Sequence, residues 1–439
     1  MGRVVKIGVS LGLTAFLLSG CMETLPFPTT FGASKAGNDA EVGRQNGNFQ
    51  KTVGEQESEI IVKLQSRRSA LVQGSAFDKV ASAVLNASAR SSEAELRQAK
   101  LRAEAQSKNW LPTIGPNISL SSLGDLVASI LIEQVLLDNG KRKAERAFAA
   151  ADVEVAAAAL SIDMNERAHS ALGLYLAALR GDEKAALSDR GLARMRKFQR
   201  IVTARVEGGV SNRADQRVAN AKVDDMQAAR ANAQEAAATA RAELSSMTGE
   251  KFDGGIGSLG ALPTIGSIEA LSVIKAQAEA TRDIAAAKAA RAGLLPSLSA
   301  SANVSGGGTK AGLNLGGGNI GFGTGAQLKA LEAGKETAAR QVAEAEEAAN
   351  RALSRQNQRL KSFRRQAVEA AKLTRDSRET FKLFQAQFEG GQRTIMDVIG
   401  VYEQLVQREQ AEVDAKYEVH LIELEIARDL GLLADGAKI

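Results

Sequence analysis

Apolar and small residues recur at helical spacing over most of the chain, which predicts long amphipathic helices. Two stretches run for about sixty residues without a proline, from Lys141 to Arg205 and over about 327–388. At 1.5 Å per residue, each would form a helix of roughly 100 Å, far longer than a globular domain needs. Shorter helical patterns are expected over about 75–108, 212–248, 268–291 and 394–430.

The two long helical patterns end in nearly the same short sequence. Ala204–Gly209 is followed about 182 residues later by Ala386–Gly391, and the two copies align without an insertion or deletion. Both copies finish on a glycine pair, Gly208 and Gly209 in the first and Gly390 and Gly391 in the second. Each pair lies between two helical patterns, so each predicts the tip of a helical hairpin.

Two stretches lose their charges and read as strands. The first predicts strands at about 113–122 and 127–137, joined by a turn around Gly124 and Asp125. The second predicts strands at about 297–304 and 311–323, and both stretches begin after a Leu-Pro pair. The fold class expected is mostly α with a small β part. Two repeats, over 57–255 and 256–439, would each supply two strands, a long helix and a return helix.

The lengths of the helices fit one packing arrangement. A return helix and the helix that follows it together span about what one long helix spans. Each long helix can therefore lie beside two shorter helices stacked end to end, with Gly249 and Gly431 marking the stacking points.

An apolar seam from Leu360 to Phe388 alternates spacings of three and four residues. This is a heptad pattern, so the helix is expected to supercoil against a neighbour as a coiled coil. The seam alone fits a plain antiparallel coiled coil equally well.

The four strands restrict how the protein can use a membrane. Strands of about 9–11 residues are long enough to cross a bilayer, but about eight strands are needed to close a barrel. Open strand edges in lipid would leave backbone groups unpaired, at several kcal/mol each. If these strands enter a membrane, several chains must share one barrel, and three chains would give about twelve strands.

The first twenty residues have a basic start, a short apolar run and small residues before Cys21, which predicts a secretory signal. Leu18-Ser19-Gly20-Cys21 is similar to a bacterial lipobox, which implies an acylated Cys21. Met22 rather than Asp follows the cysteine, and by the same resemblance to bacterial lipoproteins this favours the outer membrane. Residues 21–56 are rich in Gly, Thr, Asn, Ser and Pro and are expected to form a flexible tether.

The remaining composition narrows the chemistry. The net charge of +5 comes from basic residues interleaved with acids, which favours solvated helix surfaces over nucleic-acid binding. A single cysteine excludes an intrachain disulfide. No metal-ligand cluster, phosphate-binding loop or nucleophile–base pair is present in the sequence, so neither a cofactor nor an enzymatic activity is expected.

The order of these elements resembles the TolC-type outer-membrane factors. The resemblance covers residues 75–432 and rests on Gln134–Gly140 after the second strand, both Leu-Pro starts, and the stretch Phe388–Val398. It implies a homotrimer with a shared 12-strand barrel in the outer membrane, continuous with a helical tunnel across the periplasm. It also implies a passive exit duct that docks on a periplasmic adaptor of an inner-membrane pump or ABC transporter.

The resemblance also assigns roles to single residues. The four tip glycines match the positions where adaptor hairpins meet the tunnel. Asp215 and Arg393 match an ion-pair region that closes the entrance, and Asp397 matches an aspartate that forms a ring of three carboxylates at the pore constriction. Phe388 belongs to the closure region but replaces a tyrosine that is frequent in the family. Gly400 stands where some members carry a second aspartate.

Two questions stay open at this point. A lipid-anchored periplasmic coiled-coil tether without a pore would explain the lipobox and the helices, but not the four strands. Drug efflux and type I protein secretion use the same duct architecture, and the sequence does not choose between them.

Overall fold

The computed structural model describes residues 58–87, 90–120, 126–252, 254–263, 267–305, 308–317 and 321–439. The expected signal peptide, Cys21 and the tether lie outside these residues, as does the turn at Gly124 and Asp125. One compact unit, Gln56–Ile439, contains everything described below. It is mostly helical, with one small antiparallel sheet.

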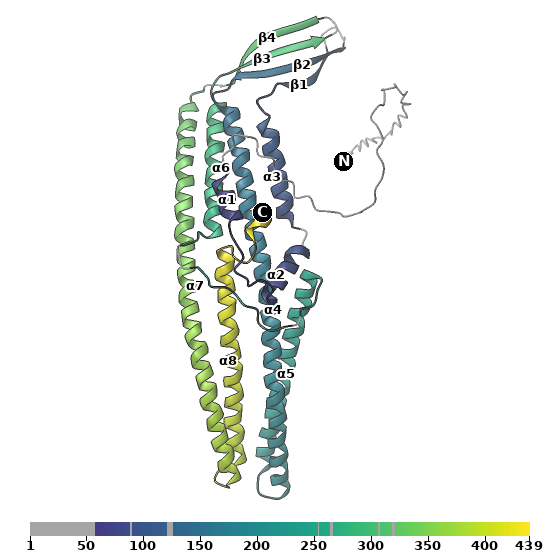
Figure 1. Cartoon of the computed structure of the whole chain (residues 1–439), viewed down its shortest axis with the longest axis vertical. Coiled ribbons are helices and arrows are strands. Elements are labelled where there is room, and N and C mark those ends of the chain that lie inside the picture. The colour runs from purple at the N-terminus through teal and green to yellow at the C-terminus, as the bar shows by residue number, and fades with distance from the viewer. Residues whose placement is uncertain are drawn as a thin grey trace, which may run out of the picture. The chain divides into compact units, whose positions relative to one another are not determined.

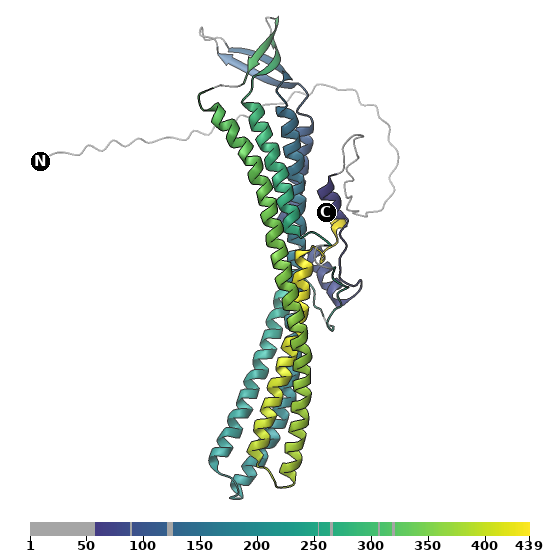
Figure 2. The ribbon, with the colours of Figure 1, turned by 90° about the vertical axis from the view of Figure 1, so that its left-hand side faces the viewer.

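Two very long helices run along this unit (Figure 1). They are α4 (Lys141–Glu207, 67 residues) and α7 (Thr324–Glu389, 66 residues). Each turns at a glycine pair into a return helix, α5 (Arg213–Thr248) or α8 (Ile395–Asp429). The return helices lie beside the half of the long helices that is farther from the sheet (Figures 1 and 2).

Shorter helices cover the half nearer the sheet. These are α3 (Ser91–Ser107), which packs on α4, and α6 (Leu271–Gly293), which packs on both α4 and α7. Short helices therefore lie along the long ones in two tiers, as the helix lengths predict (Figure 2).

The structure differs most from the sequence expectation at the start of the described chain and in the fourth strand. The single helix expected over 75–108 is two helices, α2 (Ala76–Ala87) and α3, and a further short helix α1 (Glu59–Gln65) precedes them. The fourth strand ends at Gly316 rather than 323. The reason is Gly317, whose φ of +81° is left-handed and interrupts an extended chain.

The sheet has the order β1-β2-β3-β4, all antiparallel. Its strands are β1 (Thr113–Leu120), β2 (Leu126–Leu137), β3 (Ser297–Ser305) and β4 (Gly308–Gly316). The central pair β2–β3 joins the two halves of the chain, with Ile132 opposite Ala302.

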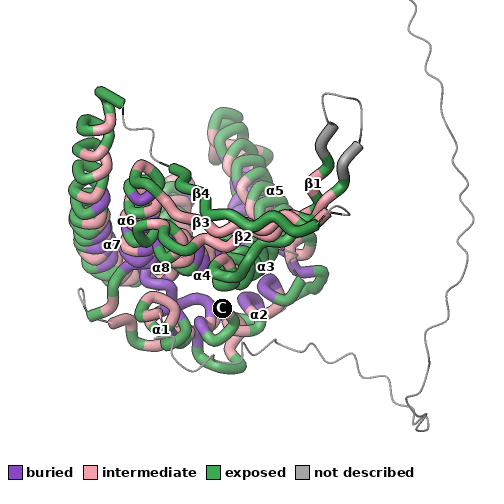
Figure 3. Tube along the Cα trace, turned by 90° about the horizontal axis from the view of Figure 1, so that it is seen from above, coloured by how far each residue is buried: buried purple, intermediate pink, exposed green. Residues whose placement is uncertain are grey.

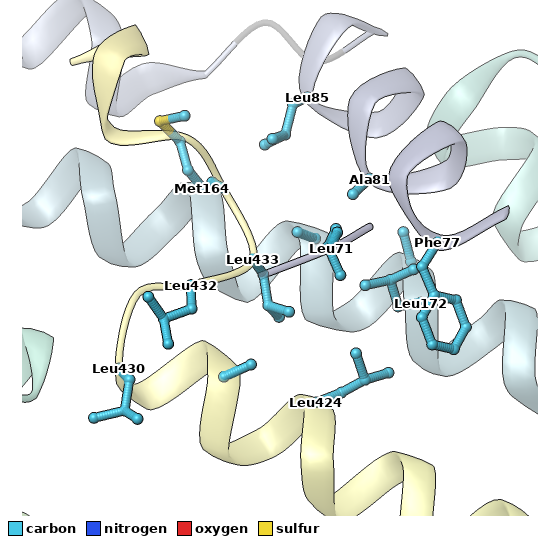
Figure 4. Close-up of a cluster of buried hydrophobic side chains, with 14 of the residues drawn as sticks. Leu71, Phe77, Ala81, Leu85, Met164, Leu172, Leu424, Leu430, Leu432 and Leu433 are labelled. Carbon is cyan, nitrogen blue, oxygen red and sulfur yellow. The ribbon is translucent and has the colours of Figure 1, made fainter. Parts of the chain in front are cut away.

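The main hydrophobic core lies at mid-height, where the two tiers of helices meet. Phe77 of α2, Leu172 of α4 and Leu424 of α8 are buried together with Leu433 of the C-terminal segment (Figure 4). A second core joins α4, α5, α7 and α8 nearer the hairpin ends.

Backbone hydrogen bonds join three segments beside the mid-height core, on one side of the long helices (Figure 2). We call residues 66–72, 258–260 and 430–436 the mid-height belt. The Arg67 guanidinium is buried in it and donates hydrogen bonds to the carbonyls of Leu430 and of Glu269, the latter at 2.6 Å. The buried Asn165 of α4 accepts from the backbone N–H groups of Leu433 (2.8 Å) and Ala434 (3.2 Å). These contacts fix the C-terminal segment against the start of the described chain.

Candidate functional site

Residues directly opposite each other in neighbouring strands point to the same side of a sheet, so the strand pairing divides the residues between two faces. One of these faces is mostly apolar and the other mostly polar. The apolar face is made by alternate residues of all four strands: Ile114, Pro116, Ile118, Ala128, Ile130, Ile132, Leu298, Ala300, Ala302, Val304, Ala311, Leu313 and Leu315. Two polar residues share this face, Gln134 opposite Ala300 and Thr309 opposite Val304. The residues between them form the other, mostly polar face: Thr113, Gly115, Asn117, Ser129, Leu131, Glu133, Val135, Ser299, Ser301, Asn303, Lys310, Gly312 and Asn314.

The apolar face is open to the surroundings in a single chain. Ile114, Ile118 and Leu313 are 70%, 66% and 69% exposed. Every residue of β4 is exposed (Figure 3), and β1 and β4 each have one edge without a partner strand. An apolar face with two open edges is suited to pairing with further strands in an apolar environment.

Exposed aromatic side chains mark the boundary between the sheet and the helices. Trp110 precedes β1 and Phe322 precedes α7, and both are largely exposed. The Gln134 side chain donates a hydrogen bond of 2.9 Å to the Trp110 carbonyl, which fixes this corner. Aromatic residues at such a boundary are typical of membrane–water interfaces.

The two hairpin ends have the same backbone geometry. At the first, the N–H of Gly209 donates to the Val206 carbonyl and that of Val210 to the Arg205 carbonyl. At the second, Gly391 donates to Phe388 and Gln392 to Gln387. This is the Schellman arrangement, and it places Gly209 and Gly391 in the left-handed region with φ of +75° and +74°.

The two glycines of one pair are expected to respond differently to substitution. Gly391→Ala should lower the free energy of unfolding by about 1 kcal/mol, because a side chain strains left-handed backbone. Gly390 has an ordinary φ of −80°, and an added Cβ would meet the nearest atom, the Ala386 carbonyl oxygen, at 3.5 Å. Gly390→Ala is therefore the matched control and should be neutral or slightly stabilising. Thermal unfolding of both variants checks this, and equal losses would contradict it.

The structure places Asp397 in the first turn of α8, where it forms a capping box with Thr394. Its carboxylate accepts from the Thr394 N–H (3.0 Å) and from the Thr394 hydroxyl (2.8 Å). These hydrogen bonds from Thr394 lower the pKa of Asp397, so the exposed carboxylate is ionised at neutral pH. A Thr followed three residues later by an acid is a sequence signal for such a cap, and it could have predicted this one.

Asp215 occupies the equivalent position in α5. Its N–H is capped by the Asn212 side chain at 2.8 Å. Within one chain Asp215 does not pair with Arg393: the Arg393 guanidinium donates to Gln387 (3.2 Å) and lies 4.6 Å from the centre of the Phe384 ring.

Phe388 connects the two hairpins instead. The guanidinium of Arg205, on the first hairpin, lies 5.7 Å from the centre of the Phe388 ring, on the second. An arginine over an aromatic face contributes about 0.5–1 kcal/mol at exposed sites. The hydroxyl that a tyrosine would add at this position is absent, and the ring contacts a cation.

Sequence reasoning missed the contacts that hold the hairpins together above their ends. Arg194 of α4 lies over the rings of Phe381 (5.2 Å) and Tyr402 (5.7 Å), which belong to α7 and α8. An ion pair of 2.7 Å joins Lys222 of α5 to Glu403 of α8. Such pairs connect helices distant in sequence, so a single-sequence pattern contains no signal for them.

Two absences were found among the described residues. No helix there has an apolar stretch long and hydrophobic enough to span a bilayer. No group of three or more His, Cys, Asp or Glu residues in the same ranges is arranged to hold a metal ion.

Comparisons with known proteins identify the fold. No family model matches the sequence, and no curated protein matches it. Among solved structures, the outer membrane protein VceC from Vibrio cholerae is 15% identical with a TM-score of 0.72, covering 81% of this chain and 96% of its own. The CmeC outer membrane channel of Campylobacter jejuni is 13% identical, with a TM-score of 0.69 and coverage of 86% and 93%.

The MtrE outer membrane channel of Neisseria gonorrhoeae, solved in its open state, is 16% identical. Its TM-score is 0.68, and the alignment covers 84% of this chain and 94% of that one. The chain therefore has the fold of outer-membrane channel proteins over nearly the full length of these structures.

Proposed function

We propose that the protein is an outer-membrane channel of the TolC-type outer-membrane factors, the exit duct of a tripartite efflux pump or a type I secretion system. The observation that carries this proposal is the sheet, with its exposed apolar face and two open edges. The shared fold with outer-membrane channels supports it. The duct conducts substrates passively, and its cargo is set by the pump to which it is coupled.

Three chains complete the pore. The open edge of β1 in one chain pairs with β4 of the next, so that twelve strands close a barrel with no edge left in lipid. The apolar face then contacts the hydrocarbon and the polar face lines a water-filled lumen. The helices of three chains continue this lumen into the periplasm as a tunnel.

The hairpin ends form the periplasmic entrance. Gly208, Gly209, Gly390 and Gly391 turn the chain there, and an adaptor that belongs to the inner-membrane pump or ABC transporter docks on these turns. Asp215, Arg393 and Phe388 belong to the closed entrance, with ion pairs made between neighbouring chains. Three copies of Asp397 form a carboxylate ring at the constriction, which favours cations.

The N-terminal segment anchors the protein. Acylation of Cys21 after removal of residues 1–20 attaches the chain to the outer membrane of a Gram-negative bacterium, in addition to the barrel. The protein needs no cofactor and catalyses no reaction. A periplasmic tether without a pore is the competing function, and it gives the apolar face of the sheet nothing to contact.

Single-channel conductance in planar bilayers tests the duct and its constriction together. The purified protein should give steady, small, cation-selective currents. Asp397→Asn should reduce the cation selectivity, because it removes the charge while an amide oxygen still accepts the hydrogen bonds of the cap. The control is Asp224→Asn, which neutralises an exposed acid of α5.

Each outcome has a definite meaning. Currents that change only with Asp397→Asn support both the pore and the ring. If neither substitution changes the currents, the proposal of a channel stands, but Asp397 is excluded from the constriction. The absence of currents from well-folded protein would favour the tether.

A further inference from the structure

The end of the α4–α5 hairpin carries positive charge that the proposed function does not explain. Between Asp189 and Arg217 the sequence has eight Lys or Arg residues and three acids. The equivalent stretch of the other hairpin, residues 371–399, has five and four. The two turns have the same backbone hydrogen bonds, but the charges of the two hairpin ends differ.

Two of the eight cations lie over aromatic rings of the same chain, although Arg194 is itself exposed. Arg194 lies over Phe381 and Tyr402, and Arg205 lies over Phe388. The other six are exposed, and we call them the basic ridge: Arg190, Arg196, Lys197, Arg200, Arg213 and Arg217.

The basic ridge has no ionic partner among the described residues. The nearby ion pairs use other cations: Arg230 holds Asp189 at 2.6 Å, and Lys222 holds Glu403 at 2.7 Å. The ridge is thus a concentration of uncompensated charge, which is costly to maintain unless something neutralises it.

The shape of the ridge indicates how a partner would lie. Its four α4 members lie on the side opposite the buried Met195 and Phe198, along about 15 Å of helix. Ile201 and Val218 are partly exposed next to them. A lateral row of cations with aliphatic neighbours fits an elongated partner alongside the helix better than a flat surface met end-on.

A second copy of the chain does not supply the missing negative charge, because its other hairpin end is close to balanced. Guanidinium groups bind carboxylates in a bidentate manner, and arginine is enriched at protein interfaces. We propose that the basic ridge is the docking surface for an acidic helical face of a periplasmic protein. Attraction between opposite charges then contributes to docking at the α4–α5 hairpin but not at the α7–α8 hairpin. This inference rests on the proposed function, since it names the chemistry of the adaptor.

The test measures binding of synthetic helical hairpins to the purified full-length protein in detergent. Two labelled probes share one sequence, but the outward face of one carries Glu and that of the other carries Gln. The Glu probe should bind the wild type about tenfold more tightly or better, and this preference should fade as NaCl rises from about 0.05 M to about 0.3 M.

A charge-reversal variant locates the surface. Arg196→Glu, Lys197→Glu and Arg200→Glu together should remove the preference for the Glu probe. If the charge-reversed protein fails to fold, the three Gln substitutions at the same positions provide a milder variant. This variant should reduce the preference for the Glu probe.

The matched control makes the same charge change on the other hairpin. Arg365, Lys372 and Arg375 of α7 are also exposed and take part in no ion pair of the described structure. Reversing these three should leave the preference for the Glu probe unchanged.

Several results would overturn the inference. They are equal binding of the two probes to the wild type, equal losses in ridge and control variants, or stronger binding of the ridge to anionic phospholipid vesicles than to the Glu probe. Altered conductance in the ridge variant with unaltered probe binding would place these cations in the lumen and would also overturn it. If the wild type conducts ions but does not bind the Glu probe, only the proposal of an acidic partner is refuted. If the wild type does not conduct ions, the proposed channel function is refuted.

Discussion

Ile118→Arg should abolish assembly into the outer membrane. Ile118 is 66% exposed on the apolar face of β1, about five residues from the helical end of the strand. In the proposed trimer this is near the middle of the bilayer, where an arginine on the lipid face costs about 2–4 kcal/mol. Three chains carry the change, so the cost per pore is about three times larger. Membrane fractionation and the yield of trimer on unheated gels measure the effect.

The neighbouring residue provides the control. Asn117 points to the polar face, so Asn117→Arg would place the same charge in the lumen. We expect Asn117→Arg to assemble normally and to lower the cation selectivity of the pore. Equal assembly of the two variants would show that the apolar face does not contact lipid.

Arg67→Met should cause the largest loss of stability in the helical part. The Arg67 side chain is only 7% exposed, and it satisfies the carbonyls of Leu430 and Glu269. Burial lowers the pKa of the guanidinium to about 10, with the Glu269 carboxylate acting in the opposite direction, so the group is still charged at neutral pH. Methionine fills similar space but leaves the buried Leu430 carbonyl and the partly buried Glu269 carbonyl without donors, and an unsatisfied buried acceptor costs about 1–3 kcal/mol. The melting temperature followed by circular dichroism is the measurement.

Arg68→Met distinguishes this mechanism from simple loss of charge. Arg68 is adjacent in sequence but exposed, and its ion pair with Asp435 (3.1 Å) lies at the surface. Surface pairs contribute about 0–1 kcal/mol, so Arg68→Met should shift the melting temperature little. Equal shifts would mean that the mid-height belt does not depend on the buried hydrogen bonds.

Most helix ends could be predicted because their signals are local. The glycine pairs, the Leu-Pro starts and the long runs without proline each act within a few residues. The expected ends of the long helices, near Arg205 and Phe388, lie within two residues of the observed ones. The predicted end of β4 was wrong, because the sequence of residues 311–323 is compatible with a continuous strand. Only the left-handed backbone of Gly317 shows where the strand ends.

The candidate site was only partly predictable. The hairpin turns were found from the repeated glycines, and the two faces of the sheet were readable from the alternation of serine with aliphatic residues over 297–305. The contacts of Arg67 could not be found, because its partner Leu430 is 363 residues away. The roles of Asp397, Asp215 and Arg393 in a pore stay predictions, since they depend on neighbouring chains. The local cluster of cations at 190–217 is not visible in the net charge of +5, because that value sums over the whole chain.

The pairing of β2 with β3 has a consequence for biogenesis. These central strands are separated by about 160 residues that include α4, α5 and α6. Contacts so distant in sequence form late, because a long loop must be closed first. If the chain is exported as proposed, the β1–β2 pair emerges well before its partner β3, with one apolar face and open edges exposed to water. In that proposed export, the unpaired strands would be a defined target for a periplasmic chaperone, and the rate at which the second half of the chain is delivered would set how long the target lasts.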